Sequence, residues 1–232
     1  MMVLEARDLV KSYRGGDGGI IHVLNGVNLS VARGEMVAIV GASGAGKSTL
    51  LHVLGALDAP SQGTVVLNGQ PIAGRSDEEL AVIRNRTVGF VFQFHHLLRE
   101  FSALENVMMP LRIGGMPVKE AQSQAERLLT RVGLSGRMHH RPSELSGGEQ
   151  QRTAVARALV ADPLVVLADE PSGNLDYANS ERLHQLFAHL SRQFETALVV
   201  VTHNRSLAAR ADRVLSLDGG RLVPLSSVES MP

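Results

Sequence analysis

A glycine-rich segment, residues 41–48, has the residue types and spacing of a loop that binds phosphate. It reads Gly-Ala-Ser-Gly-Ala-Gly-Lys-Ser and fits the pattern G-x-x-x-x-G-K-[ST]. Glycines allow successive backbone N–H groups to point inward without Cβ clashes, and the helix expected after the loop adds a favourable dipole. We therefore expect a nucleoside triphosphate here, with Lys47 reaching the β- and γ-phosphates and Ser48 ligating Mg²⁺. The predicted nucleotide-binding residues of this segment are Gly41, Ala42, Ser43, Gly44, Ala45, Gly46, Lys47, Ser48 and Thr49.

Two acidic residues form the second chemical feature of the chain. Asp169 and Glu170 directly follow the apolar run Leu164–Ala168. The side chains of such a run are buried, so the acids emerge at the carboxyl edge of a sheet, where α/β proteins bind ligands. We expect Asp169 to hold Mg²⁺ through water and Glu170 to polarise the attacking water. Taken alone the pair also fits a solvated acidic strand end, but beside a phosphate loop it predicts an ATPase that uses ATP and Mg²⁺.

The composition narrows the possible classes of protein. The 232 residues, 44% of them hydrophobic, fit one large α/β domain. Lys plus Arg and Asp plus Glu both number 23, so the formal net charge of zero gives no general attraction to nucleic acid or anionic lipid. The absence of cysteine excludes disulfides and cysteine-ligated zinc. The first ten residues do not read as a signal peptide, and no apolar run approaches the roughly 20 residues that cross a bilayer. If this protein works at a membrane, we expect another chain to supply the membrane part.

Short β-branched runs alternate with longer helical patterns, which predicts an α/β fold with a largely parallel sheet flanked by helices. The expected strands are 3–10, 23–31, 36–40, 64–67, 88–92, 164–168, 197–202, 213–217 and 222–223. The expected helices are 47–55, 78–85, 120–132, 148–161 and 179–194. We expect a single domain, 1–232, whose core spans about 1–93 and 162–232. A helical subdomain of about 94–161 interrupts this core.

Three further segments carry a resemblance to a known family. Leu145–Gln150 reads Leu-Ser-Gly-Gly-Glu-Gln, Val165–Pro171 reads Val-Val-Leu-Ala-Asp-Glu-Pro, and Ser172–Asp176 reads Ser-Gly-Asn-Leu-Asp. With the phosphate loop, these segments resemble the ATP-binding cassette (ABC) family, the nucleotide-binding subunits of ABC transporters, over essentially the whole chain. The resemblance implies a P-loop NTPase fold with a RecA-like core, an N-terminal antiparallel β subdomain and an inserted helical subdomain. It also implies that ATP hydrolysis is coupled to transport.

The resemblance assigns roles to single residues outside the phosphate loop. It implies that Tyr13 stacks on adenine and that Gln93 senses both the γ-phosphate and the magnesium ion. His203 matches the switch histidine near the γ-phosphate, and Asp176 lies in the loop at the dimer interface. The predicted catalytic residues are thus Glu170, His203 and Gln93, and the predicted metal site is Ser48, Gln93 and Asp169.

Ser146, Gly147 and Gly148 match the signature motif of the family. A serine hydroxyl, glycine amides and the positive end of the following helix form a second anion site. The resemblance implies that this site closes on the γ-phosphate held by an opposing subunit, so that a head-to-tail homodimer encloses two ATP molecules. A phosphate that touches both chains supplies the differential affinity that favours the closed state.

A narrower resemblance is to the ATPases of bacterial lipoprotein-releasing (Lol) systems, in the segments 92–98, 103–110 and 140–148. It implies a homodimer on the cytoplasmic face of the inner membrane that powers two transmembrane permease subunits, touches the membrane only through them and binds no nucleic acid. Apolar residues after Gln93 are numerous for a solvated lobe and would suit a groove for a partner helix, or the core of the lobe itself. They are Phe94, Leu97, Leu98, Phe101, Met108 and Met109.

Two other functions stay open from the sequence. The ATPase of a macrolide-efflux or cell-division complex shares the mechanism and much of the sequence. A soluble cassette protein of DNA repair or translation belongs to a different class, whose zinc-binding cysteines, long coiled coils or tandem cassettes this chain lacks. The chain departs from common family residues at Asn204, Ser172 and Arg99, where aspartate, threonine and proline are usual. Adjacent histidines at 95–96 and 139–140 do not readily converge on one metal ion.

Overall fold

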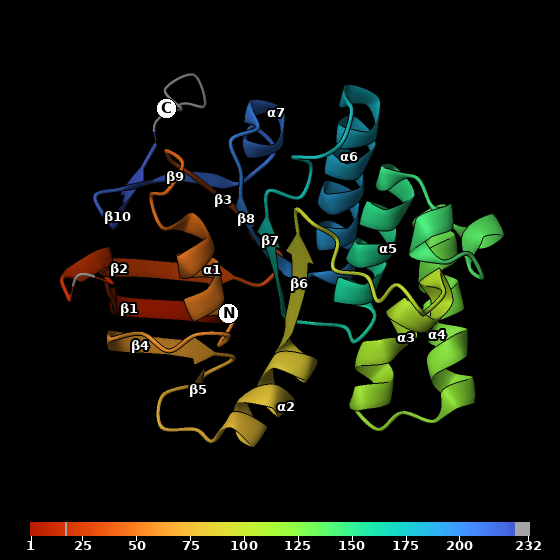
Figure 1. Ribbon diagram of the computed structural model, residues 1–232, viewed down its shortest axis with the longest axis horizontal. Coiled ribbons are helices and arrows are strands. Elements are labelled where there is room, and N and C mark those ends of the chain that lie inside the picture. Colours follow the sequence, from red (N-terminus) through yellow and green to blue (C-terminus); the bar gives the residue numbers. More distant parts are fainter. Residues whose placement is uncertain (17, 226–232) are drawn as a thin grey trace.

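The computed structural model describes residues 1–16 and 18–225, apart from the side chains of residues 190–193, and contains two sheets (Figure 1). The four-stranded antiparallel sheet has the order β2-β1-β4-β5, and the six-stranded sheet has the order β10-β9-β3-β8-β7-β6. The strands are β1 (Met2–Arg14), β2 (Ile20–Ala32), β3 (Met36–Val40), β4 (Gln62–Leu67), β5 (Gln70–Pro71), β6 (Val88–Phe92), β7 (Val165–Asp169), β8 (Ala197–Val201), β9 (Arg213–Asp218) and β10 (Arg221–Pro224). The expected α/β fold with an N-terminal antiparallel β subdomain is confirmed.

Seven α-helices are assigned within the described residues: α1 (Lys47–Leu54), α2 (Asp77–Thr87), α3 (Ala103–Ile113), α4 (Val118–Arg131), α5 (Gly147–Leu159), α6 (Tyr177–Phe194) and α7 (Arg205–Ala208). Several have caps that the sequence itself carries. Ser102 accepts a hydrogen bond from the N–H of Glu105, whose carboxylate accepts one from the N–H of Ser102, and this capping box starts α3. The sequence did not predict α3 as a separate helix, although its S-x-x-E signal was present.

The larger sheet is parallel from β9 to β6, and only its edge strand β10 runs antiparallel. Strands β3 and β8 are buried along their whole length, which explains why their sequences are continuously apolar rather than alternating. Side chains on β3 still alternate between faces: Ala38 and Val40 join the core under α5 and α6, and Val37 and Ile39 join the core under α1 and the antiparallel sheet. The sheet is thus held rigidly from both sides.

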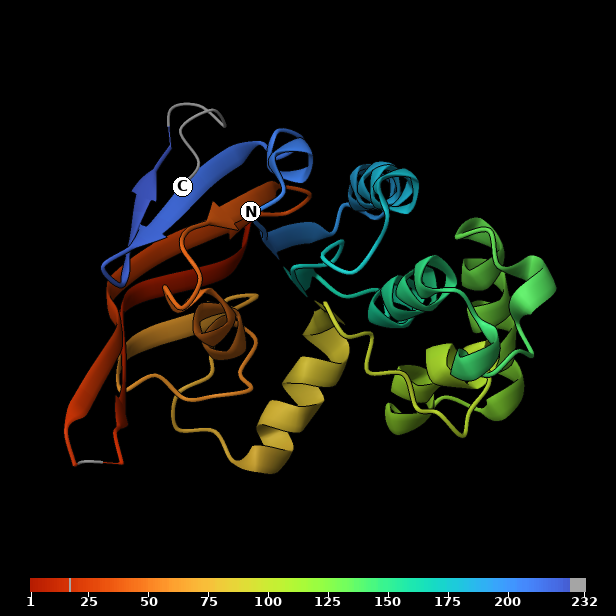
Figure 2. The ribbon, with the colours of Figure 1, turned by 45° about the horizontal axis from the view of Figure 1, so that its top comes forward.

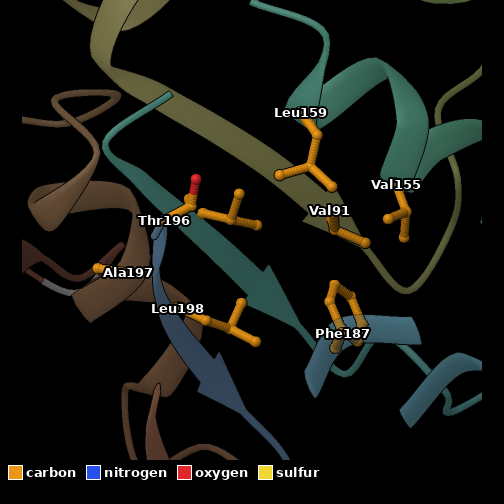
Figure 3. A pocket seen from close by; sticks show the side chains of 8 residues that line it. Val91, Val155, Leu159, Phe187, Thr196, Ala197 and Leu198 are labelled. Carbon is orange, nitrogen blue, oxygen red and sulfur yellow. The ribbon is translucent and has the colours of Figure 1, made fainter. Parts of the chain in front are cut away.

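Between β6 and β7 the chain forms α3, α4 and α5, which make a lobe beyond the edge strand β6 (Figures 1 and 2). This arrangement fits the interruption of the core expected from the sequence. Figure 3 shows Val91, Leu159 and Phe187 pointing into a small space between the sheet and the helices α5 and α6. Its volume of about 10 Å³ and its mainly apolar lining mark it as a packing gap, because a water molecule needs at least about that volume and several polar partners.

Candidate active site

The parallel sheet brings several of the predicted site residues to one edge. In the register of the sheet, Ile39 of β3 is opposite Val201 of β8, Val201 is opposite Asp169 of β7, and Asp169 is opposite Phe92 of β6. The residues directly beyond these positions belong to the phosphate loop, the His203 segment, Glu170 and Gln93. Four segments that are far apart in the sequence therefore start from one line across the sheet.

Two glycines of the phosphate loop have no room for a side chain. A Cβ on Gly41 would lie 2.6 Å from the carbonyl oxygen of Leu217, and one on Gly46 would lie 2.6 Å from a methyl carbon of Val23. Gly46 also has a φ of 97° and is the residue before α1, so the tight turn into the helix requires glycine. Lys47 Nζ donates hydrogen bonds to the carbonyls of Gly41 (2.8 Å) and Ala42 (2.9 Å). The loop is thus a tight turn closed by one ammonium group, and this form fits the expected triphosphate site.

The carboxylate of Glu170 is fixed by the His203 segment. Its Oε1 lies 2.9 Å from Nδ1 of His203, and its Oε2 accepts a hydrogen bond of 3.3 Å from the N–H of His203. Glu170 has a φ of 43°, in the left-handed region that costs a non-glycine residue roughly 1–3 kcal/mol. The glutamate is mostly covered, whereas the histidine side chain is 71% exposed. This geometry suits a base that is held still beside an accessible imidazole.

Asp169 ends β7 and is half-buried, next to Glu170, while Ser48 is exposed in the first turn of α1. Gln93 is less free than expected. Its amide nitrogen donates to Oδ1 of Asn174 (3.2 Å), and the amide of Asn174 donates back to the carbonyl of Gln93 (3.2 Å). Asn174 was not predicted, although it lies in the quoted segment 172–176. Oxygen donors from Ser48, Asp169 and Gln93 are the ligands that Mg²⁺ prefers, so the donor set fits this ion.

Tyr13 on β1 is 41% exposed and is held by two residues that the sequence reading missed. Its hydroxyl donates to Oδ2 of Asp58 (2.8 Å), and Nζ of Lys11 donates to Oδ1 of Asp58 (2.6 Å) and lies 4.8 Å from the centre of the Tyr13 ring. Burial raises the pKa of Tyr13, its hydrogen bond to Asp58 adds to the rise, and Thr49 of α1 acts in the opposite direction. Burial alone would raise the pKa of Asp58, but the hydrogen bonds from Lys11 and Tyr13 hold it below its usual value. The ring is thus oriented beside the phosphate loop.

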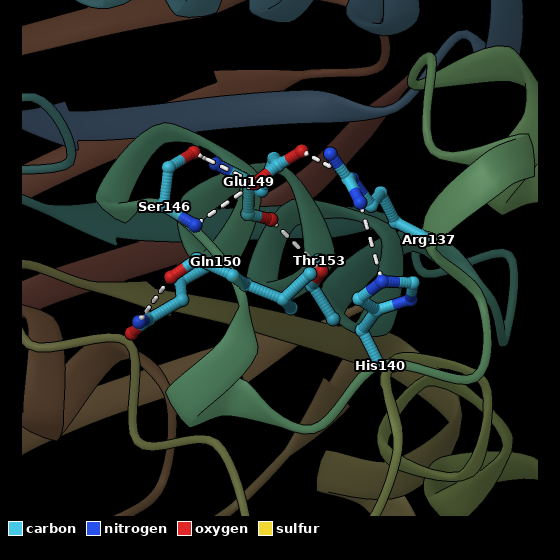
Figure 4. A network of polar contacts seen from close by, with 7 residues as sticks. Arg137, His140, Ser146, Glu149, Gln150 and Thr153 are labelled. Atoms are coloured by element: carbon cyan, nitrogen blue, oxygen red, sulfur yellow. Dashed lines mark hydrogen bonds and ion pairs between the residues drawn. The ribbon is translucent and has the colours of Figure 1, made fainter.

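Ser146 is the N-cap of α5, and Figure 4 shows the network around it. Ser146 Oγ accepts a hydrogen bond from the N–H of Glu149 (3.3 Å), and the Glu149 carboxylate accepts bonds from the N–H and the hydroxyl of Ser146, both at 2.8 Å. These bonds, led by the one from the N–H of Ser146, lower the pKa of Glu149, and Arg137 approaches the same carboxylate at 3.1 Å.

The two signature glycines have different surroundings. Gly147 is exposed, and a Cβ there would meet only the Leu175 side chain at 3.9 Å. Gly148 is buried, and a Cβ there would lie 2.7 Å from the side-chain oxygen of Asn179 on α6. Asn179 is itself held by Asp176, which caps α6 by accepting its N–H at 2.9 Å. Gly148 is thus needed for helix packing, while Gly147 leaves a bare backbone surface beside Ser146.

The signature segment and the phosphate loop are not brought together within one chain. The start of α5 lies at the helical lobe, and α1 lies across the sheet from it in both views (Figures 1 and 2). One chain therefore presents its two candidate anion sites on separate surfaces.

A groove of about 400 Å³ runs between β6, α2 and the helices α3 and α5. Its lining includes Leu57, Phe90, Phe92, Met109 and Ile113, together with two cationic side chains, Arg84 and Arg157. Of the apolar residues expected in this region, Phe94, Leu98 and Phe101 are exposed, whereas Met108 packs against the core. The segment thus contributes both to core packing and to an exposed apolar surface, and contact of that surface with a partner helix stays a prediction. Within the part of the chain that the structure describes, no helix combines the length and apolar character that a bilayer span requires.

Comparison with known proteins gives consistent matches. The family model "ABC transporter" matches residues 24–173. The chain is 56% identical over 221 residues to the lipoprotein-releasing system ATP-binding protein LolD of Bordetella pertussis, covering 95% of each chain. It is 54% identical over 226 residues to LolD 2 of Chlorobaculum tepidum, covering 95% of this chain and 92% of that protein.

The structural matches extend over nearly the whole chain. A dimeric post-hydrolysis state of the ATP-binding cassette MJ0796, bound to ADP and Pi, matches with a TM-score of 0.89 and 37% identity over 97% of this chain and 98% of that one. A second dimeric structure of MJ0796, described as a bacterial ABC transporter cassette, has a TM-score of 0.87 at 38% identity, covering 94% and 96% of the two chains.

Proposed function

Because this chain belongs to the ABC transporter family, we propose that its ATP hydrolysis powers the release of outer-membrane lipoproteins from the inner membrane. The chain is an ATPase of the ABC class, and the lipoprotein-releasing branch is supported by relatives at 54% and 56% identity over almost their full length. The macrolide-efflux and cell-division branches are less well supported, because both sequence relatives reported above are lipoprotein-releasing system ATP-binding proteins.

The observation that carries the proposal is the common line of strand ends. The phosphate loop, Glu170, His203 and Gln93 all follow strands that end on this line, which supports a shared role for them at one nucleotide. In our assignment Lys47 and the loop amides bind the phosphates, Tyr13 stacks on adenine, and His203 holds the Glu170 carboxylate toward the attacking water. Ser48, Asp169 and Gln93 would hold Mg²⁺, which when bound neutralises phosphate charge.

The site is completed by a second copy of the chain. Ser146 and Gly147 are exposed and lie at the N-terminus of α5, whose first N–H groups can bind an anion. The hydroxyl of Ser146, which here donates to the Glu149 carboxylate, would turn to a phosphate that enters. A γ-phosphate bound by one subunit would therefore be gripped by the signature segment of the other, and hydrolysis would remove that link. The dimeric form of the structural relatives supports this arrangement.

The groove beside α3 is the proposed contact with two transmembrane permease subunits of the Lol type. Its apolar lining suits one face of an amphipathic helix. Arg84 donates to the carbonyl of Ala56, and Arg157 donates to the carbonyls of His95 and His96; among the described residues neither forms an ion pair with a carboxylate. Association through this groove would place the protein on the cytoplasmic face of the inner membrane, held there by its partners.

Reconstitution tests the proposal. The chain is combined in proteoliposomes with lipoprotein-release permease proteins from the same organism, and ATP-dependent transfer of a fluorescent outer-membrane lipoprotein to a soluble acceptor is measured. We expect release with wild-type protein and none with Glu170→Gln. Normal release without this chain, or its purification from cells with a division or efflux permease and no lipoprotein-release permease, contradicts the lipoprotein branch.

A further inference from the structure

A buried histidine on α6 has no place in the mechanism described so far. His184 is 1% exposed and lies inside the domain, behind the loop that follows Glu170. Its Nε2 is 3.0 Å from Oγ of Ser172, which is itself buried. Its Nδ1 faces Oε1 of Glu181 at 3.4 Å without forming an aligned hydrogen bond. The position of the buried His184 side chain is therefore set by the groups packed around it.

The neighbouring carboxylate connects the same helix to a second loop. Glu181 accepts a hydrogen bond of 2.5 Å from the hydroxyl of Ser206 and one of 2.7 Å from Arg210. Ser206 lies in α7, which begins directly after His203 and Asn204. Through His184 and Glu181, α6 therefore contacts the loop after Glu170 on one side and the segment after His203 on the other.

Those two segments also meet at the proposed reaction centre, where Glu170 and His203 are 2.9 Å apart. The contact between Glu170 and His203 closes a cycle of contacts. The cycle runs from Glu170 through Ser172, His184, Glu181 and Ser206 back to His203. In such a cycle each residue is held by contacts on two sides. Glu170 needs this support because its backbone is in the left-handed region.

The charge state of the His184 imidazole follows from its neighbours. The groups that face it are the Glu181 carboxylate on its own helix, the Arg210 guanidinium beside α7, and the Ser172 hydroxyl. Burial lowers the pKa of His184, against the opposing effect of Glu181, so the ring is neutral near pH 7. We assign the imidazole proton to Nδ1, the nitrogen that faces the Glu181 carboxylate, and this assignment makes Nε2 the acceptor and the Ser172 hydroxyl the donor.

We infer that His184 is a positioning residue for ATP hydrolysis: its ring holds Ser172, and so keeps Glu170 aligned with His203 when the nucleotide is bound. The inference rests on the proposed roles of Glu170 and His203. It predicts a slower chemical step when His184 is replaced. It also predicts little change in nucleotide affinity, because His184 contacts none of the proposed nucleotide-binding residues.

The test compares His184→Met, which keeps the volume and removes the hydrogen bond, with His184→Gln, whose amide can reach the position of Nε2. His189→Met serves as the control because His189 is on the same helix and exposed. Steady-state hydrolysis of ATP with Mg²⁺ is measured for each full-length protein. For His184→Met we expect kcat to fall about tenfold and KM to change less than about twofold, the result of a misplaced reacting group. His184→Gln should recover most of kcat, and His189→Met should match the wild type.

Ser172→Ala gives a test that does not depend on the folding of His184→Met, and the double variant Ser172→Ala/His184→Met completes the comparison. If the two residues act as one unit, the double variant loses no more kcat than either single variant. Unchanged kcat in Ser172→Ala, additive losses in the double variant, or no recovery in a folded His184→Gln protein overturns the inference. Glu170→Gln is assayed alongside: if it keeps turnover, the proposed active site falls and this inference with it. If it is inactive while Ser172→Ala is normal, the inference alone fails.

Discussion

Replacing Gly147 with alanine should raise the free energy of unfolding and yet lower the rate of ATP hydrolysis. Gly147 is the first residue of α5, its φ is not among the positive values, and a Cβ there would make one ordinary contact, 3.9 Å from Leu175. Alanine at a compatible helical position stabilises by about 0.5–1 kcal/mol, chiefly because the unfolded chain loses freedom. For a protein of this size that raises Tm by about 1–4 °C.

The effect on turnover has the opposite sign. In the proposed dimer the backbone at Gly147 faces the γ-phosphate of the other subunit, and a methyl group there would push that phosphate from the N–H groups. A lost hydrogen bond to a charged group costs about 1.5–3 kcal/mol, which corresponds to a fall in kcat of about 10- to 150-fold.

Thermal unfolding by circular dichroism and phosphate release from the same preparation measure both effects. The matched control is Gly148→Ala, whose Cβ would lie 2.7 Å from the Asn179 side chain, so it should destabilise by about 1–3 kcal/mol through overpacking. Asn179→Ala in that background should restore part of the stability. A Gly147→Ala protein with a normal turnover rate would refute the composite site, and one with a lowered Tm would refute the packing argument.

Three other predictions follow from the site. Glu170→Gln should abolish phosphate release but allow an ATP-stabilised dimer, seen by size-exclusion chromatography; a protein that remains monomeric with ATP contradicts composite sites. Asp58→Ala should release the Tyr13 ring and weaken nucleotide binding about 3- to 10-fold, as expected for the loss of one or two hydrogen bonds, and an unchanged Kd in a fluorescent-nucleotide titration speaks against an adenine platform. The folded-state pKa of His184 is lowered, so its contribution to stability is complete above the unfolded value near 6.5 and declines as the pH falls below it, by at most about 1.4 kcal/mol per pH unit. The drop in Tm between pH 7.5 and 5.5 should be smaller in His184→Gln, and an equal drop would show that another group is responsible.

The elements that the sequence predicted best are those whose signal is local. Strand β3 begins and ends at the expected residues because it is a short buried run between a polar segment and the phosphate loop. Strand β1 continues to Arg14, well past the expected end at Val10, because pairing with β2 reaches as far as Arg14 opposite Ile20. Pairing with a neighbouring strand can keep polar residues in a strand. The hydrophobic pattern of a single segment does not reveal this pairing.

The same distinction holds for the site. The phosphate loop and the two acids at the end of β7 could be found from spacing alone, since each motif is contiguous. Asp58 could not, because its partner Lys11 is 47 residues away, and the pairing of Gln93 with Asn174 spans 81 residues. His184 was equally hidden: one histidine in an amphipathic helix says nothing about which hydroxyl it meets. These residues do not perform the proposed chemistry but hold those that do, and only the folded chain shows them.

The loop from Ser172 to Asp176 contacts three segments around the proposed site. Asn174 is paired with Gln93, Ser172 with His184, and Asp176 with Asn179, which packs against Gly148 at the start of α5. Ser172, the first residue of this loop, is two positions beyond Glu170 in the sequence. Movement of any one contact therefore displaces the others, because a packed loop with this many fixed points has few independent positions. In the proposed dimer this loop faces the other subunit, so a change at one γ-phosphate would alter the position of Glu170 in the same chain and the surface offered to the partner.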